Sequence, residues 1–345
     1  MILYRNRFNS LYNKSSNYSA KDNLTNDLNS FMKSGCLLQY KDNHTGAGIM
    51  KIGIIGGGAV GLLFASYLSG FHEVVLYTRT KEQADLINEE GVTLLEGNER
   101  FLKKVRAMTS GNISRQEELL IIAVKQYHLE GLMEKIQKTP SPILFIQNGY
   151  SHVKMLKELP QDDIYLGVME HGALKHNGNT VEHTGEGVTK IARYRGEIDH
   201  LQLLHKKIER FPITVVKDYR QMLQEKLVVN SVINPLTGIL GIRNGELVEN
   251  PYYYGLFRDY FNEISEILEL EDAAAYEEHV KQVCQKTANN RSSLLKDLEN
   301  GRKTEIDAIS GYLISIAKEK NKSHLLTDAV YRMVKGKEYQ GGDRM

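Results

Sequence analysis

The sequence predicts an α/β chain in which an open, doubly wound sheet is followed by an all-helical half. Three observations carry this prediction. A short apolar run ends in a glycine-rich turn at residues 56–61, and an apolar helix-like stretch follows it. Further short apolar runs alternate with amphipathic stretches up to about residue 217. Beyond that residue, apolar side chains recur only at helical spacing.

Composition limits the classes of function, and a length of 345 residues suits two domains better than one. The 44 Lys and Arg residues balance 43 Asp and Glu residues, so the basic surface of a dedicated nucleic-acid binder is not expected. No apolar run approaches the roughly 18 residues of a membrane helix. Cys36 and Cys284 are too few for a disulfide framework or a thiolate zinc site, and the histidines are scattered. We therefore expect a cytoplasmic enzyme without a metal, a nucleic-acid partner or a membrane partner.

Residues 1–49 differ in composition from the rest of the chain. They hold eight Asn and six Ser, with six Lys and Arg against three Asp and Glu, and no helical or strand period persists. A secretory signal would need a compact apolar core, and a transit peptide would need more arginine than Arg5 and Arg7 supply. We interpret the segment as a disordered leader or as the result of an upstream start choice, with the natural start expected at Met50. A regulatory or targeting arm is the alternative.

The first predicted strand, residues 51–55, runs directly into the pattern GxGxxG. Gly56 permits a tight turn, Gly58 lets backbone amides approach a pyrophosphate, and Gly61 lets the following helix pack closely on the strand. That helix, at residues 62–68, adds unpaired N–H groups and the positive end of its dipole. A glycine-rich turn without a ligand is the alternative, but strand, turn, helix and second strand in this order predict a Rossmann-type dinucleotide site. The predicted cofactor-binding residues of this loop are Gly56, Gly57, Gly58, Ala59, Val60 and Gly61.

The residue that follows the second predicted strand, residues 73–78, indicates which dinucleotide binds. An NAD-selective site places Asp or Glu here to accept a hydrogen bond from the ribose 2′-hydroxyl. This chain has Arg79, with Lys81 close by. A cation suits a 2′-phosphate, so the sequence favours NADP(H) over NAD(H). A solvated surface arginine is the alternative interpretation.

Polar residues follow two further apolar runs. Lys125 comes after the run at 119–124, and Asn148 follows the run at 142–146. Ligands of doubly wound sheets lie outside the carboxyl ends of the strands, so both residues are candidates for the cofactor and substrate site. A turn role for Asn148 and a solvated charge for Lys125 stay open. Later strands are expected at residues 164–169, 188–192 and 213–216.

The segment 225–237 is the most informative part of the helical half. Its apolar residues cover most of the helix circumference, which predicts deep burial. Lys226, Asn230 and Asn234 nevertheless line up four residues apart on one stripe. A buried lysine is costly without a partner, so the stripe indicates a ligand-facing surface rather than interhelical hydrogen bonds alone. Pro235 is expected to end or kink this helix.

Two motifs nearer the C-terminus complete the polar candidates. Ser292 and Ser293 belong to one helical stretch. Thr304 and Asp307 resemble a capping box at the start of another helix. That structural role leaves Glu305, between them, free to point elsewhere.

Several motifs follow one another in an order and spacing typical of one family. They are the GxGxxG loop, Lys125, Gln147-Asn148-Gly149, Lys226-Leu-Val-Val-Asn230-Ser-Val-Ile-Asn234-Pro235-Leu-Thr237, Asn244-Gly245-Glu246-Leu247, Ser292-Ser293 and Thr304-Glu305-Ile306-Asp307. In these motifs the chain resembles the 2-dehydropantoate 2-reductase family, also called ketopantoate reductases, from residue 50 to about 338. The resemblance implies an N-terminal Rossmann-type NADP-binding domain at 50–217 and a C-terminal all-helical domain at 218–338, with a tail at 339–345.

The resemblance also implies a role for each candidate residue. Lys226 would be the general acid, and Glu305 would be the second catalytic residue. Independently of the resemblance, the apolar helix around Lys226 is expected to lower its pKa, and a nearby carboxylate such as Glu305 would oppose that shift. Arg79 would meet the 2′-phosphate. The substrate would be held by Asn148, Asn230, Asn234, Ser293 and Glu305, with Lys125 and Asn148 beside the cofactor as well.

The implied reaction is NADPH-dependent reduction of 2-dehydropantoate (ketopantoate) to (R)-pantoate by hydride transfer, in pantothenate and coenzyme A biosynthesis. We expect a monomer or homodimer. Two alternatives stay open: another NADP-dependent 2-oxo or 3-hydroxy acid reductase of the same architecture, and a non-catalytic NADPH-binding regulator. The joint presence of Lys226, Asn230, Ser293 and Glu305 argues against the regulator, since a sensor needs none of them.

Overall fold

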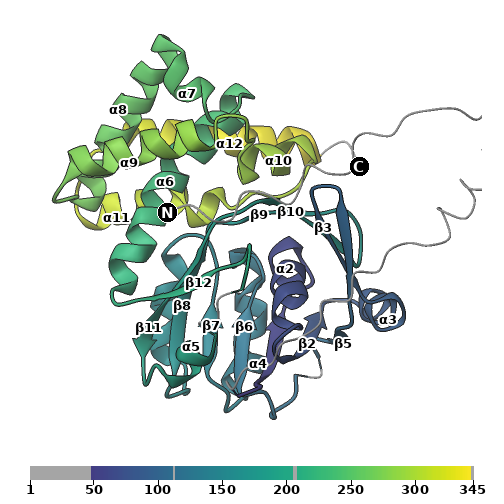
Figure 1. Ribbon diagram of the computed structural model, residues 1–345. Coiled ribbons are helices and arrows are strands. Elements are labelled where there is room, and N and C mark those ends of the chain that lie inside the picture. Colours follow the sequence, from purple (N-terminus) through teal and green to yellow (C-terminus); the bar gives the residue numbers. More distant parts are fainter. Residues whose placement is uncertain (1–47, 112, 205–207, 343–345) are drawn as a thin grey trace, which may run out of the picture. The chain divides into compact units, whose positions relative to one another are not determined.

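A computed structural model of the chain describes residues 48–111, 113–204 and 208–342, all of which belong to one compact unit at residues 42–345 (Figure 1). Apart from its last two residues, the predicted leader at 1–49 lies outside this description. The tail predicted from residue 339 starts inside the last helix, α12 (Leu325–Gly342), and its final residues 343–345 are not described.

An eight-stranded sheet forms the centre of the first half, and its order is β12-β11-β8-β7-β6-β1-β2-β5. All neighbours run parallel except β11 and β8, which are antiparallel. The crossover from β1 to β2 on one side and to β6 on the other confirms the predicted doubly wound arrangement. The strands are β1 (Lys51–Ile55), β2 (Glu73–Thr78), β5 (Arg106–Thr109), β6 (Leu119–Ile122), β7 (Ile143–Phe145), β8 (Ile164–Met169), β11 (Thr189–Arg195) and β12 (Ile213–Val216).

Alternate side chains of the central strands enter two different apolar cores. Leu119 and Ile121 face the core around the first helix, whereas Leu120 and Ile122 face the core on the other side of the sheet. This explains why β6 is apolar at every position, since a parallel strand covered on both faces has no polar side. The helices of this half are α2 (Ala59–Leu68), α3 (Lys81–Glu90), η1 (Gln126–His128), α4 (Glu130–Gln137), η2 (Ser151–Glu158) and α5 (Asp199–Leu204).

A second, four-stranded sheet of order β4-β3-β10-β9 was not expected from the sequence. Helix α2 contacts β1 and β2 of the large sheet and also β3, β9 and β10 of the small one. It therefore lies between two sheets, which accounts for the burial of nearly all its residues. The strands of the small sheet are β3 (Val92–Glu96), β4 (Glu99–Lys103), β9 (Gly172–Lys175) and β10 (Thr180–Gly185).

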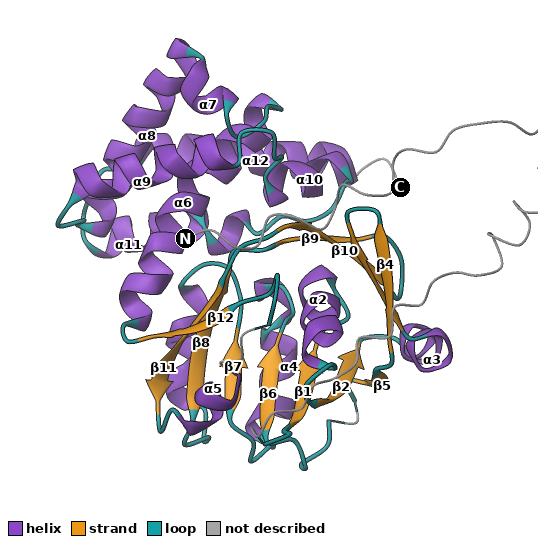
Figure 2. Cartoon of the chain, in the orientation of Figure 1, coloured by secondary structure: helices purple, strands orange, loops and turns teal. Residues whose placement is uncertain are grey.

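The second half is helical, as predicted, and is arranged around the long helix α6 (Tyr219–Leu240) (Figure 2). Asp218 caps its N-terminus by accepting hydrogen bonds from two backbone N–H groups, and Gly241 ends it in a left-handed conformation with φ 71°. Pro235 was expected to end or kink the helix; an end at this residue is wrong, because α6 continues through it. Deep burial among other helices supports this segment without the hydrogen bond that proline cannot donate. The remaining helices are α7 (Glu246–Glu249), α8 (Pro251–Leu268), α9 (Ala273–Lys286), α10 (Ser293–Glu299), η3 (Ile306–Ala308), α11 (Ser310–Glu319) and α12.

Helix α6 joins the two halves. It contacts α8, α9, α10 and α12 and also strands β8 and β11. The carboxyl ends of the parallel strands point toward the helical half (Figure 2), and Tyr150, after β7, stacks on Tyr312 of α11 with ring centroids 5.8 Å apart. The fold therefore directs the strand ends, where a dinucleotide binds, at the helices that carry the other polar candidates. Within the described part of the chain, no helix has the length and apolar character needed to cross a membrane.

Candidate active site

The glycine loop has the geometry that a dinucleotide requires. Gly56 has φ 123°, and a Cβ there would lie 2.8 Å from the carbonyl oxygen of Ala123. A Cβ on Gly61 would lie 1.8 Å from the carbonyl oxygen of Gly56, so this position admits only glycine. Nothing lies within 4 Å of a Cβ built on Gly58, which leaves open space over the backbone. The loop thus combines a tight turn and close packing with a backbone that a phosphate can approach.

The N-terminus of α2 supports this assignment. Its N-cap is Gly58, which has no side chain to cap the helix, so the first N–H groups of the helix remain available to a ligand. The contiguous residues Gly56 to Gly61 all belong to this turn or to the first turn of α2. The residues present therefore fit the pyrophosphate of a dinucleotide.

Arg79 directly follows β2, with an exposed side chain. Its charge acts on two neighbours: it contributes, after burial, to the lowered pKa of Lys175 and of His128. None of the ion pairs among the described residues involves Arg79 or Lys175. The ribose end of the loop is thus cationic, which agrees with a cofactor that carries a 2′-phosphate.

Two polar contacts connect the strand ends to the helical half. Lys125 Nζ donates to Asp297 Oδ2 at 2.6 Å, and Asn148 Nδ2 donates to Glu305 Oε2 at 3.0 Å. Three residues that the sequence singled out separately are therefore brought together from segments more than 150 residues apart. Asp297, from α10, was missed, because one acidic residue in a helix carries no signal of its partner.

Burial and the neighbouring charges together set the pKa values of Glu305 and Lys125. It raises the pKa of Glu305, while the hydrogen bond from Asn148 and the charge of Lys125 oppose the shift. Burial also lowers the pKa of Lys125, but the hydrogen bond and charge of Asp297 outweigh it and leave that pKa raised. Asp297 is almost buried and also pairs with Arg302 Nε at 3.1 Å. Lys125 therefore stays cationic, and the raised pKa of the nearby Glu305 makes protonation of that carboxyl group easier.

Helix α6 carries the predicted stripe. Lys226 is half-buried, its ammonium makes no hydrogen bond or ion pair with any described residue, and burial lowers its pKa. The carboxylate that opposes this shift is Glu170, not Glu305 as expected, and the charge of Lys190 adds to the lowering. Lys190 itself pairs with Glu170 at 3.1 Å. The sequence offered no sign of Glu170, which follows β8 and approaches α6 only through the fold.

The two asparagines of the stripe are nearly buried, with 7% and 8% of Asn230 and Asn234 exposed. In the described structure neither side-chain amide forms a hydrogen bond, although buried amides usually do. The interhelical hydrogen bonds that were the alternative explanation of this stripe are therefore not formed. Asn230 and Asn234 are available to a polar ligand, one and two helical turns from Lys226.

Ser292 and Ser293, at the start of α10, have different roles. Ser292 is the N-cap: its Oγ accepts from the N–H of Leu295 and bonds Thr237 Oγ1 of α6 at 2.8 Å. Ser293 begins the helix with an exposed side chain that no described residue engages. Its hydroxyl is free for a ligand, whereas Ser292 is structural.

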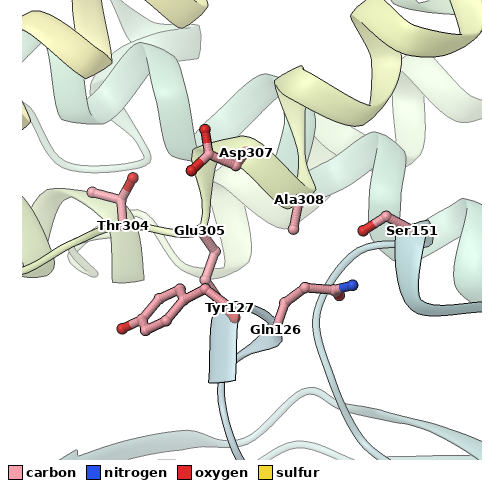
Figure 3. A pocket seen from close by; sticks show the side chains of 7 residues that line it. All are labelled: Gln126, Tyr127, Ser151, Thr304, Glu305, Asp307 and Ala308. Carbon is pink, nitrogen blue, oxygen red and sulfur yellow. The ribbon is translucent and has the colours of Figure 1, made fainter. Parts of the chain in front are cut away.

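A pocket of about 170 Å³ lies beside Glu305 (Figure 3). It does not include the stripe of α6 or Ser293. The capping box expected for Thr304 and Asp307 is not formed, because Thr304 bonds Glu338 at 2.6 Å and Asp307 accepts from Tyr331 at 2.8 Å. The pocket is lined by Gln126, Tyr127, Ser151, Thr304, Glu305, Asp307 and Ala308.

Comparison with known proteins agrees with this geometry. Residues 52–196 match the family described as "Ketopantoate reductase PanE/ApbA", and residues 218–338 match its C-terminal counterpart. The 2-dehydropantoate 2-reductase of Bacillus subtilis (strain 168) is 42% identical over 84% of this chain and 98% of its own length. That of Listeria innocua is 39% identical over 84% of this chain and 97% of its own length.

Solved structures share the fold. A probable 2-dehydropantoate 2-reductase from Bacillus subtilis is 40% identical, with a TM-score of 0.78 over 84% of this chain and all of the other. A D-mandelate dehydrogenase solved with NADH has a TM-score of 0.77 over 85% of this chain and 99% of its own, but at 23% identity it is evidence of the fold only. With two family matches over most of its length and relatives at about 40% identity, the chain belongs to the ketopantoate reductase family.

Proposed function

We propose that this chain reduces 2-dehydropantoate to (R)-pantoate with NADPH, and that Lys226, Asn230, Asn234, Ser293, Glu305, Asn148 and Lys125 form the site. The observation that carries the proposal is the pair of contacts between the strand ends and the helical half, Lys125 with Asp297 and Asn148 with Glu305. These contacts bring residues from both halves to the edge of the sheet at which the glycine loop lies.

The cofactor would be held by residues of the first half. The N–H groups at the start of α2 would bind the pyrophosphate, Arg79 the 2′-phosphate, and Lys125 and Asn148 would lie beside the reactive end. When bound, NADPH supplies the hydride that reduces the substrate carbonyl. A fixed, buried environment around that carbonyl strengthens every electrostatic contact made there.

Lys226 would donate the proton that the carbonyl oxygen needs. Hydride addition builds negative charge on this oxygen, and an ammonium placed beside it both stabilises the charge and supplies a proton. Burial lowers the pKa of Lys226, which moves this lysine toward the range in which proton transfer is efficient. The absence of a hydrogen-bond partner among the described residues leaves the ammonium free for the substrate.

The remaining side chains would orient the substrate. Asn230, Asn234 and Ser293 offer neutral donors and acceptors for the carboxylate and carbonyl of ketopantoate. Glu305 would accept a hydrogen bond from the 4-hydroxyl, and Asn148 fixes the carboxyl group through its bond to Oε2. A site that holds a buried acceptor for this hydroxyl discriminates against analogues that lack it.

The organisation of the chain follows from the same proposal. A nucleotide-binding domain would span residues 50–217 and a substrate domain 218–338. Strand β12 ends at Val216 and α6 begins at Tyr219, so the boundary falls between the last strand and the central helix. We further propose a cytoplasmic enzyme that is a monomer or homodimer and serves pantothenate and coenzyme A synthesis.

The substrate assignment is tested by NADPH oxidation, followed by absorbance, with ketopantoate beside a panel of other 2-oxo acids. We expect ketopantoate to have the highest kcat/KM. Glu305→Ala should lower turnover of ketopantoate much more than turnover of an analogue without the 4-hydroxyl. A preference for another 2-oxo acid would favour a different reductase of the same architecture, and no oxidation with any acid would favour a non-catalytic NADPH-binding protein.

A further inference from the structure

Lys175 reaches the glycine loop from the small sheet. It ends β9, and its Nζ donates to the carbonyl oxygen of Gly57 at 2.8 Å. Strands β9 and β10 pair antiparallel and contact α2, so this hairpin lies beside the helix that starts at the glycine loop (Figure 1). A lysine far from the loop in sequence is therefore held within hydrogen-bond distance of it.

The hairpin is attached to the loop at a second point. Gln83, in the first turn of α3, donates from Nε2 to the carbonyl oxygens of both Gly57 and Gly178, at 2.8 and 2.7 Å. A Cβ on Gly57 would lie 2.6 Å from the amide of Gln83, so the contact is close-packed. Gln83 thus ties the hairpin that carries Lys175 to the loop, in addition to the hydrogen bond that Lys175 itself makes.

No carboxylate among the described residues forms an ion pair with Lys175. Glu182 of the neighbouring strand β10 bonds His176 at 2.7 Å, and no charged group other than Arg79 shifts the pKa of Lys175. The half-buried ammonium of Lys175 instead feels the like charge of Arg79, and burial together with that charge lowers its pKa. Placing two cations close together without a carboxylate costs free energy unless an anion binds between them.

We infer that Lys175 is a second phosphate-binding residue, which acts with Arg79 on the 2′-phosphate of NADP(H). The inference rests on the proposed function, since it concerns the cofactor of that reaction. A guanidinium binds two phosphate oxygens in a planar fork, whereas an ammonium acts as a compact point charge, so the two side chains complement each other on one phosphate group. The hydrogen bond to Gly57 holds the ammonium in place before the cofactor arrives.

A purely structural role for Lys175 predicts a different result. If the lysine only stabilised the loop through Gly57, or met the pyrophosphate, its loss would weaken NADPH and NADH alike. Only contact with the 2′-phosphate makes the loss selective for NADPH. Measuring the affinity of the Lys175 variant for both NADPH and NADH therefore distinguishes a structural role from contact with the 2′-phosphate.

The test is a fluorescence titration of the full chain with NADPH and NADH, together with displacement of NADPH by 2′,5′-ADP. Lys175→Met should raise the Kd for NADPH and for 2′,5′-ADP by about ten- to a hundredfold, the effect of one charge-assisted hydrogen bond, and leave the Kd for NADH nearly unchanged. Lys175→Arg should keep most of the preference. Lys51→Met is the matched control, because this exposed lysine lies at the opposite end of β1 from the loop and should change neither Kd.

Two outcomes would overturn the inference: an equal loss for both cofactors in Lys175→Met, or no loss for either. Failure of the proposed function would look different from both outcomes. In that case the unaltered chain itself would bind NADPH no better than NADH, or would fail to reduce ketopantoate.

Discussion

At the scale of single residues, the structure explains why Lys226 suits proton transfer better than an ordinary lysine. Burial lowers its pKa, the charge of Lys190 lowers it further, and the carboxylate of Glu170 raises it. The first effect could be predicted from an apolar helix that contains one lysine. The identity of the two charged neighbours could not, because Glu170 and Lys190 come from the β8 end and β11 and approach α6 only in the folded chain.

This balance gives a prediction for the pH dependence of turnover. A general acid must be protonated, so kcat should fall as the pH rises through the pKa of Lys226, and this limb should lie below the ordinary lysine pKa of 10.5. Glu170→Gln removes the group that raises the pKa and should move the limb to lower pH. Lys190→Met removes a group that lowers it and should move the limb to higher pH. Profiles of kcat for the three proteins check the signs, and a shift in the same direction for both variants would contradict the account.

At the scale of elements, the sequence predicts best where one element carries its own pattern. Strands β1, β2, β8 and β12 have the predicted bounds, because each is a short apolar run limited by polar or turn residues. The small sheet was missed. Strands β4, β9 and β10 are only partly buried and mix charged with apolar residues, so their period of two is weak, and β3 pairs with β10, which is distant in sequence. The passage of α6 through Pro235 was missed because burial by neighbouring helices outweighs the local preference.

Two glycines of the strand–turn–helix element provide a matched pair. A methyl group on Gly61 would overlap the backbone of Gly56, whereas one on Gly58 meets open space. Gly61→Ala should therefore lower the free energy of unfolding by about 1–3 kcal/mol or more. Gly58→Ala should leave it within about 1 kcal/mol but weaken NADPH binding, since the added methyl group occupies the space that the phosphate approaches. Thermal unfolding measures the stability of the two variants, and NADPH titration measures their affinity for the cofactor. Equal stability of the two variants would contradict the close packing of Gly61 against Gly56.

At the scale of the whole molecule, the two halves and their order were predictable, but the contacts between them were not. Lys125 and Asp297 are 172 positions apart, and Asn148 and Glu305 are 157 positions apart. Neither local propensity nor periodicity relates residues at such separations. The candidate residues were identified from the sequence motifs and the family resemblance. The fold brings Asn148 to Glu305 and Lys125 to Asp297.

The stability of the whole chain should depend on pH through His152. Its ring is fully buried beside Phe145, neither ring nitrogen has a hydrogen-bond partner among the described residues, and burial lowers its pKa from 6.5 to about 4. The unfolded chain takes up this proton more readily, so the contribution of His152 is complete above pH 6.5 and is lost as the pH falls toward 4. The loss between pH 7.5 and pH 5 should be about 2 kcal/mol.

His152→Leu tests this prediction, with His279→Leu as the control at an exposed position. Denaturant unfolding at pH 7.5 and pH 5 should show a smaller loss of stability for His152→Leu than for the unaltered chain. The control should lose as much stability as the unaltered chain. An unchanged pH dependence in His152→Leu would show that this histidine does not titrate as its burial requires.

The most direct test of the central claim is the turnover of ketopantoate with NADPH by the Lys226→Met variant, measured together with its NADPH affinity. Methionine keeps the unbranched side chain but removes the ammonium, so packing of α6 is retained while the proton donor is lost. We predict that kcat falls by about 10²–10⁴, the range for loss of a general acid, and that the Kd for NADPH stays nearly unchanged. A variant that folds, binds NADPH and reduces ketopantoate at a near-normal rate would contradict the assignment of Lys226.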